Sequence, residues 1–152
     1  MSNDLKFKIS HKITEDNSSN FTIKPLDRGY GITVGNSLRR ALLTAVPGAA
    51  ITNVKIEGAH HEFSTMDGVT EDVADVIMNL KGVRFHLFES SVEPIFLKVK
   101  GPKAFTAADI QAASNDFTIL NPDHYITDIA KGTTLEVELR LGIGKGYKSS
   151  EE

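Results

Sequence analysis

Two adjacent histidines and the glutamate that follows them, His60, His61 and Glu62, are the residues whose types most readily suggest chemistry. Imidazole and carboxylate groups can hold a divalent metal that activates water for hydrolysis. In a strand, however, adjacent side chains point to opposite faces, so one site cannot use both histidines there. The helical His-Glu-x-x-His pattern is missing, and the chain has no cysteine. The pattern favours surface histidines, with a small metal-dependent hydrolase as the alternative hypothesis.

A glycine-rich segment, Gly29 to Gly31 followed by Gly35, could in principle bind phosphate through backbone N–H groups. A dinucleotide-binding fingerprint requires a third glycine where Val34 stands, and the Gly-Lys-Ser/Thr ending of a P-loop is missing. A turn before a helix is a sufficient reason for these glycines. We therefore expect no bound cofactor.

Side chains that could act as catalytic acids or nucleophiles are also explained without catalysis. Asp67, Glu71, Asp72 and Asp75 gather around the start of a predicted helix, where acidic residues complement the helix dipole in any case. Ser64 has no glycine elbow of the Gly-x-Ser-x-Gly kind around it. We predict no catalytic residue and no metal ligand.

The consecutive arginines Arg39 and Arg40 diverge by about 100° around a helix, so only one of them can lie beside an apolar stripe. One interpretation is a solvated helix surface whose aliphatic stems cover apolar neighbours. The other is a subunit interface, where arginine is enriched. Spacing alone favours the first interpretation and leaves the second open.

The composition is that of a folded domain and is compatible with a reducing compartment. The 152 residues are 40% hydrophobic and 24% charged, which is typical of a globular protein. The net charge of -3 and the pI of about 5.9 argue against a free-standing nucleic-acid binder, which would usually carry a basic face. Without cysteines there are no disulfides, and no apolar run is long enough for a membrane helix. We expect a cytoplasmic protein with no membrane contact.

Polar and apolar residues alternate twice near the N-terminus, which predicts two strands. One covers Leu5 to Ser10, and the other covers Phe21 to Lys24, ending at Pro25. The polar stretch from Thr14 to Asn20 is a natural hairpin connection between them.

A helix is predicted from Thr33, as N-cap, to Val46, with Pro47 as a stop. Gly35 inside this helix makes most sense if another backbone packs closely against it. The apolar stripe consists of Val34, Leu38, Leu42 and Ala45, widened by Leu43 and Val46.

The remainder of the chain predicts short strands and one further helix. The helix runs from Thr70, as N-cap, to Lys81, with Gly82 just past its end. Its apolar stripe is Val73, Val76, Ile77 and Leu80. The predicted strands are Ile51–Glu57, a pair Val83–Phe88 and Ile95–Lys100 around Ser90 and Ser91, Phe117–Leu120, Tyr125–Ile129 and Thr134–Leu141. The expected fold class is α+β, with a boundary near Pro47.

Three stretches together resemble the bacterial RNA polymerase α subunit. The first is PLDRGYGITVGNSLRRALL at positions 25–43. The second combines HEFST at 61–65, GVTED at 68–72 and NLKG at 79–82. The third is TAADI at 106–110, with GKGY at 144–147 near the end. Ordered motifs of this length are highly specific, and the resemblance covers nearly the whole chain, with least support before Phe21.

The resemblance implies a non-catalytic assembly scaffold in transcription. Residues 1–47 are expected to form the first half of a dimerisation subdomain and residues 48–141 an inserted, mainly antiparallel β subdomain with one helix. Residues 142–152 are expected to begin the return to the dimerisation subdomain. The implied partners are a second α subunit and the β and β′ subunits, and no cofactor is implied.

The resemblance also implies roles for particular residues. Arg40, Leu43, Lys81 and Gly82 match family positions that face the β subunit, which favours the interface interpretation of Arg40. For the dimer seam the expected residues are Val34, Gly35, Leu38 and Leu42, because a helix–helix contact needs an apolar stripe and tolerates an internal glycine.

The family continues past Tyr147 with further strand, a long helix, a flexible linker and a small DNA-contacting domain, whereas this sequence ends at Glu152. We therefore expect a truncated chain, with no direct DNA contact from this segment. An incompletely covered stripe invites self-association. Pairing of this chain with a full-length α subunit is a further hypothesis.

Overall fold

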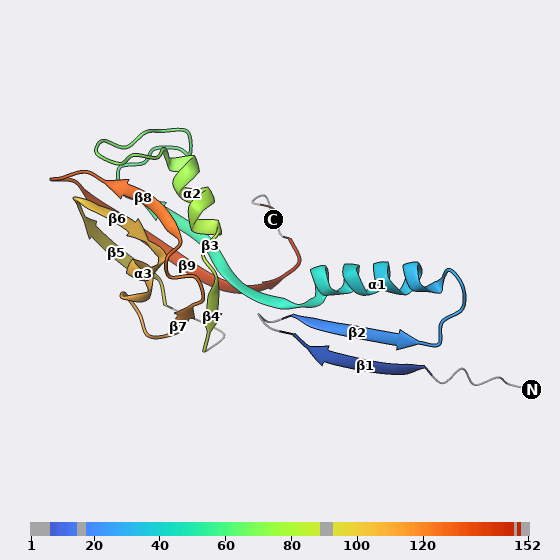
Figure 1. The fold of residues 1–152 in the computed structure, drawn as a ribbon. Helices are drawn as coiled ribbons and strands as arrows, with labels where there is room; N and C mark the ends of the chain where they lie inside the picture. The colour runs from blue at the N-terminus through green and yellow to red at the C-terminus, as the bar shows by residue number, and fades with distance from the viewer. Residues whose placement is uncertain (1–6, 15–17, 89–92, 148, 150–152) are drawn as a thin grey trace, which may run out of the picture. The chain divides into compact units, whose positions relative to one another are not determined.

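The computed structural model describes residues 7–14, 18–88, 93–147 and 149, which divide between two compact units, Met1–Val46 and Pro47–Glu152. The first unit contains strands β1 (Lys8–Ile13) and β2 (Ser19–Lys24) and helix α1 (Tyr30–Ala45) (Figure 1). The two strands form an antiparallel pair, as predicted, with Ile9 opposite Ile23. The first strand continues to Ile13, past the predicted end at Ser10. Leu5 and Lys6, where its start was predicted, lie outside the described residues.

Helix α1 begins earlier than predicted, because the chain turns at Gly29 rather than at Thr33. Gly29 is the N-cap residue and has a φ of 92°, a left-handed conformation that glycine adopts without strain. The predicted stop is confirmed. Val46 is already extended, since the residue before a proline is driven out of the helical region. Val46 therefore does not belong to the helical stripe.

In its described residues, the second unit is a mainly antiparallel β structure with two short helices, α2 and α3, which confirms the α+β class. A five-stranded sheet has the order β5-β9-β3-β4-β7, and β6 pairs with β8 in a separate two-stranded sheet. The elements in chain order are β3 (Pro47–Ile56), α2 (Val73–Lys81), β4 (Phe85–Leu87), β5 (Ile95–Lys100), β6 (Lys103–Thr106), α3 (Ala107–Gln111), β7 (Phe117–Ile119), β8 (Tyr125–Ile129) and β9 (Thr134–Lys145).

The predicted pairing of the fourth and fifth strands is wrong. β4 lies between β3 and β7, whereas β5 pairs with β9 at the other edge of the sheet. The turn residues on which that prediction relied, Ser90 and Ser91, lie outside the described residues. Alternation defines a strand but not its neighbour, because the ladder partner can come from anywhere in the chain.

Two further boundaries differ from the prediction. Helix α2 starts at Val73, and its N-cap is Asp72, whose carboxylate accepts a 2.8 Å hydrogen bond from the Asp75 N–H. Thr70 is therefore not the cap. β9 continues past Leu141 to Lys145 because the start of β3 pairs with it, Pro47 standing opposite Lys145.

The core of the second unit lies on one face of the five-stranded sheet. Alternate residues of β9, namely Leu135, Val137 and Leu139, are buried, as the alternation predicted. Helices α2 and α3 contribute Val76, Leu80 and Ile110 to the same hydrophobic cluster. Among the described residues, no helix is long and apolar enough to cross a membrane.

Candidate subunit-contact surfaces

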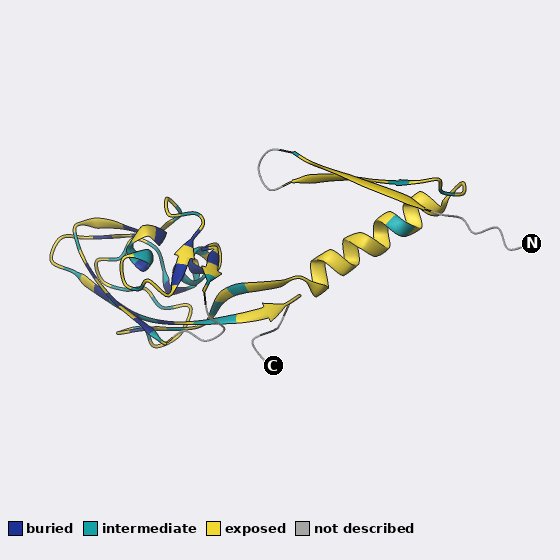
Figure 2. Cartoon of the chain, turned by 90° about the horizontal axis from the view of Figure 1, so that it is seen from below, coloured by how far each residue is buried: buried dark blue, intermediate teal, exposed yellow. Residues whose placement is uncertain are grey.

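Helix α1 has no buried residue (Figure 2). Of the expected dimer-seam residues, Val34 is half-buried, whereas Leu38 is 47% and Leu42 64% exposed. A Cβ built on Gly35 would meet nothing within 4 Å. The close backbone neighbour that an internal glycine suggested is therefore not supplied by the described residues of the first unit.

The regular helix distributes the expected contact residues over two faces. At about 100° per residue, Val34, Leu38 and Leu42 fall within about 40° of one line along the helix. Around the helix axis, Leu43 lies about 140° from Leu38. Arg40 lies about 160° from Leu38 in the opposite sense, so Leu43 and Arg40 are only about 60° apart and share a second face. Leu43 is 64% exposed, and Arg40 is exposed as well. Leu43 does not widen the stripe, contrary to the sequence prediction; it belongs with Arg40.

Lys81 and Gly82 lie at the C-terminal end of α2. Lys81 is the last residue of the helix, where its charge complements the helix dipole, and it is exposed. Gly82 is the C-cap residue. A Cβ added to Gly82 would lie 2.6 Å from Nε2 of His124, so this position has no room for a larger residue.

Met78 is a candidate contact residue that sequence reasoning missed. It precedes Lys81 by three residues, which places the two on the same side of α2. Its side chain is 63% exposed although it is large and apolar. The sequence did contain a signal for this residue. Met78 is apolar but does not belong to the buried stripe of α2, so it had to face away from the core.

Glu71 has a different role from the one predicted. Its Oε1 accepts a hydrogen bond from Tyr125 Oη at 2.8 Å, and its Oε2 accepts one from Thr127 Oγ1 at 2.5 Å and one from the Asp128 N–H at 3.3 Å. Partial burial raises the pKa of Glu71, but the hydrogen bonds from Thr127 and Tyr125 outweigh it, so the pKa lies below its usual value. The carboxylate of Glu71 thus connects the segment before α2 to β8 through hydrogen bonds.

His60, His61 and Glu62 are exposed and lie in the loop between β3 and α2. The His61 carbonyl accepts hydrogen bonds from the N–H and the hydroxyl of Ser64, at 3.1 and 2.6 Å, which closes a turn. Within the described ranges, no three histidine or acidic side chains gather closely enough to hold a metal ion. Among the residues that the structure describes, no third ligand therefore joins these histidines.

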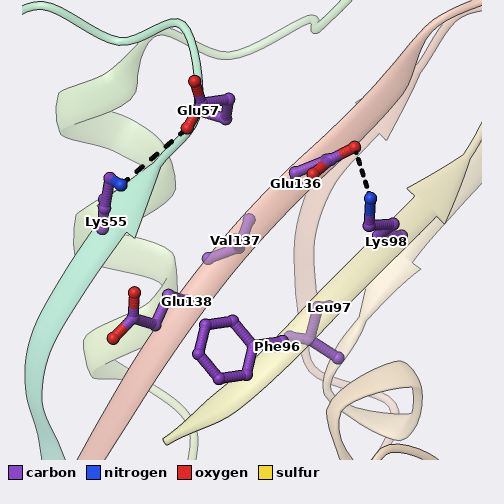
Figure 3. Close-up of a pocket in the computed structure, with 8 residues that line it drawn as sticks. All are labelled: Lys55, Glu57, Phe96, Leu97, Lys98, Glu136, Val137 and Glu138. Atoms are coloured by element: carbon purple, nitrogen blue, oxygen red, sulfur yellow. Dashed lines mark hydrogen bonds and ion pairs between the residues drawn. The ribbon is translucent and has the colours of Figure 1, made fainter.

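The outward face of the five-stranded sheet has a shallow depression of about 200 Å³ between β3, β9 and β5 (Figure 3). Lys98 forms a 2.9 Å ion pair with Glu136, and Lys55 stands 4.0 Å from Glu57. Phe96 is exposed beside them. The charges are largely matched, and none of the expected contact residues lines the depression.

Comparison with known proteins identifies the second unit most directly. The family described as "RNA polymerase Rpb3/RpoA insert domain" matches residues 54–152. That range contains β9, α2 and the whole hydrophobic core.

Relatives extend the similarity into the first unit. The chain is 50% identical over 137 residues to the DNA-directed RNA polymerase subunit alpha of Salinibacter ruber, covering 90% of this chain and 42% of that protein. It is 47% identical over 132 residues to the same subunit of Chloroherpeton thalassium, covering 87% and 40%. For Limosilactobacillus reuteri the identity is 50% over 143 residues, covering 93% and 45%. The chain thus spans less than half the length of these relatives. By the insert-domain match and these identities, the chain belongs to the family of bacterial RNA polymerase α subunits.

Proposed function

We propose that this chain is a non-catalytic assembly subunit of a bacterial RNA polymerase, acting in transcription in the cytoplasm. It pairs with a second α chain through the Val34, Leu38 and Leu42 face of α1, and it binds the β and β′ subunits. The observation that carries the proposal is the exposure of α1, in which no residue is buried. Family membership supports an assembly with other polymerase subunits, in which such a helix would be covered.

The first unit has a physical reason to require a partner. An isolated helix of 16 residues is only marginally stable in water. Most helical stability in proteins comes from packing an apolar face, and burying one leucine contributes about 1.5–3 kcal/mol. Leu38 and Leu42 gain little of this energy while they remain exposed. A second polypeptide on this face would supply it.

The second face of α1 is assigned to the β subunit. Arg40 and Leu43 lie together there and combine a bidentate donor with an apolar side chain, the mixture that favours an interface. Lys81 and Gly82 at the end of α2 are assigned to the same partner. In this proposal residues 1–47 and 142–152 contribute to dimerisation and residues 48–141 form the inserted subdomain. With a net charge of -3, the segment is assigned no direct DNA contact.

Binding of the purified β subunit by the full chain tests these contact assignments. Arg40→Ala and Lys81→Ala should each weaken binding by about fivefold to thirtyfold, since interface arginines often contribute more than 1 kcal/mol. Arg140→Ala is the matched control because it removes the same charge from an exposed position on β9 that is not among the assigned contact residues. Undiminished binding by both Arg40→Ala and Lys81→Ala would refute the contact assignments while leaving family membership intact.

A further inference from the structure

The turn that ends α2 is held by a loop from a distant part of the chain, residues 121–124 between β7 and β8. The Asn79 carbonyl accepts two hydrogen bonds, one from the Gly82 N–H at 3.0 Å and one from Nε2–H of His124 at 2.8 Å. The imidazole lies so close that a Cβ on Gly82 would stand 2.7 Å from Cε1 as well. His124 therefore occupies the space that the missing side chain of Gly82 leaves.

Asn121 holds the other side of the same turn. Its Nδ2 donates to the Gly82 carbonyl at 3.0 Å, and its Oδ1 accepts from the Arg84 N–H at 2.8 Å. The side chain of Asn79 adds a third link by donating to the Ile126 carbonyl at 2.8 Å. The peptide groups after Lys81 are thus fixed from outside the helix.

The loop itself is anchored to the core. The N–H groups of Ala107 and Ala108, in the first turn of α3, donate to the carbonyls of His124 and Pro122, each at 2.9 Å. Ala107 is fully buried, so this end of α3 cannot move without disturbing the core. The loop residues Asn121 and His124 therefore connect the turn after Lys81 to the core.

We propose that His124 and Asn121 are positioning residues for Lys81: by fixing the backbone turn that follows it, they set the point from which its exposed side chain extends toward an acidic surface of the β subunit. Neither residue is required to touch that partner. The inference rests on the proposed function, which assigns Lys81 to the β contact. A backbone turn that is fixed before binding lowers the entropy cost of ordering this segment on binding.

A double-mutant cycle on β-subunit binding by the full chain tests the inference. His124→Ala should weaken binding by about threefold to tenfold, the effect of one lost hydrogen bond. In the Lys81→Ala background the same substitution should have no further effect, because residues that act through one group are not additive. His124→Gln, whose Nε2 can still donate to the Asn79 carbonyl, should restore much of the affinity. His86→Ala, which removes an exposed histidine from β4, is the matched control.

Each alternative result has a distinct meaning. If Lys81→Ala leaves binding unchanged, the proposed β contact at Lys81 is wrong, and the positioning role falls with it. If Lys81→Ala weakens binding but His124→Ala does not, or if the two effects add, the positioning role alone is overturned. If His124→Ala fails to fold by circular dichroism, Asn121→Ala takes its place in the same cycle with the same expected non-additivity.

Discussion

Thr127, whose side chain is fully buried in β8, donates a 2.5 Å hydrogen bond to Oε2 of Glu71, which lies directly before the N-cap of α2. The neighbouring hydrogen bond from Tyr125 binds the other carboxylate oxygen. Together they join two segments that are more than fifty residues apart. The start of α2 is therefore fixed by a charge-assisted contact as well as by its cap.

Replacing Thr127 with valine should lower the free energy of unfolding by about 2 kcal/mol, because a buried hydrogen bond to a charged group is lost while the side-chain volume is kept. Urea denaturation followed by circular dichroism measures this. Thr118→Val on β7 is the control: Thr118 is exposed, and its substitution should change the free energy by less than about 0.5 kcal/mol. Equal effects of the two substitutions would show that the contact contributes nothing.

Glu71 should also make stability depend on acidity. Its pKa in the folded protein is below the ordinary value of 4.5, so the folded state favours the ionised form. The stabilisation is therefore fully present above about pH 4.5 and is lost as the pH falls through the folded-state pKa. The neutral variant Glu71→Gln should be less stable than the wild type at neutral pH, with the difference shrinking in acid. Urea denaturation at a series of pH values measures both; a difference that stays constant with pH would contradict this role.

The elements with strong periodicity could be predicted from the sequence. The spacing of Val73, Val76 and Leu80 indicated the buried face of α2, and all three residues are buried. The alternation around Val137 indicated the inward face of β9. In both cases the pattern reports burial directly, because one face must meet the core.

Features that depend on distant or very short segments could not be predicted in this way. Glu71 was interpreted as a dipole-complementing residue because nothing near it in sequence indicates Thr127. Helix α3 was not predicted, since five residues are too few for periodicity; its only signal was Asp109, whose carboxylate accepts from the Thr106 N–H at 3.1 Å. The assignments of Arg40 and Lys81 came from family resemblance, and they stay predictions.

Gly68 should tolerate no side chain. Its φ is 77°, and a Cβ there would lie 2.0 Å from Oγ1 of Thr133. Gly68→Ala should therefore cost about 2 kcal/mol or more, combining backbone strain with a steric clash. Gly132 has a similar φ of 88° but open space around it, so Gly132→Ala should cost only about 1 kcal/mol from strain. Thermal melting of both variants checks the difference, and equal costs would mean that the neighbouring Thr133 moves away freely.

Sedimentation velocity of the full chain over a range of concentrations tests most directly whether the Leu38 face of α1 is built to be covered by a second copy. The wild-type chain should self-associate, and Leu38→Glu should raise the dissociation constant by at least about tenfold, since a charge would be placed in a desolvated contact. Leu43→Glu, the matched substitution on the opposite face, should leave self-association unchanged. A wild-type chain that stays monomeric throughout, or equal effects of the two substitutions, would contradict the account.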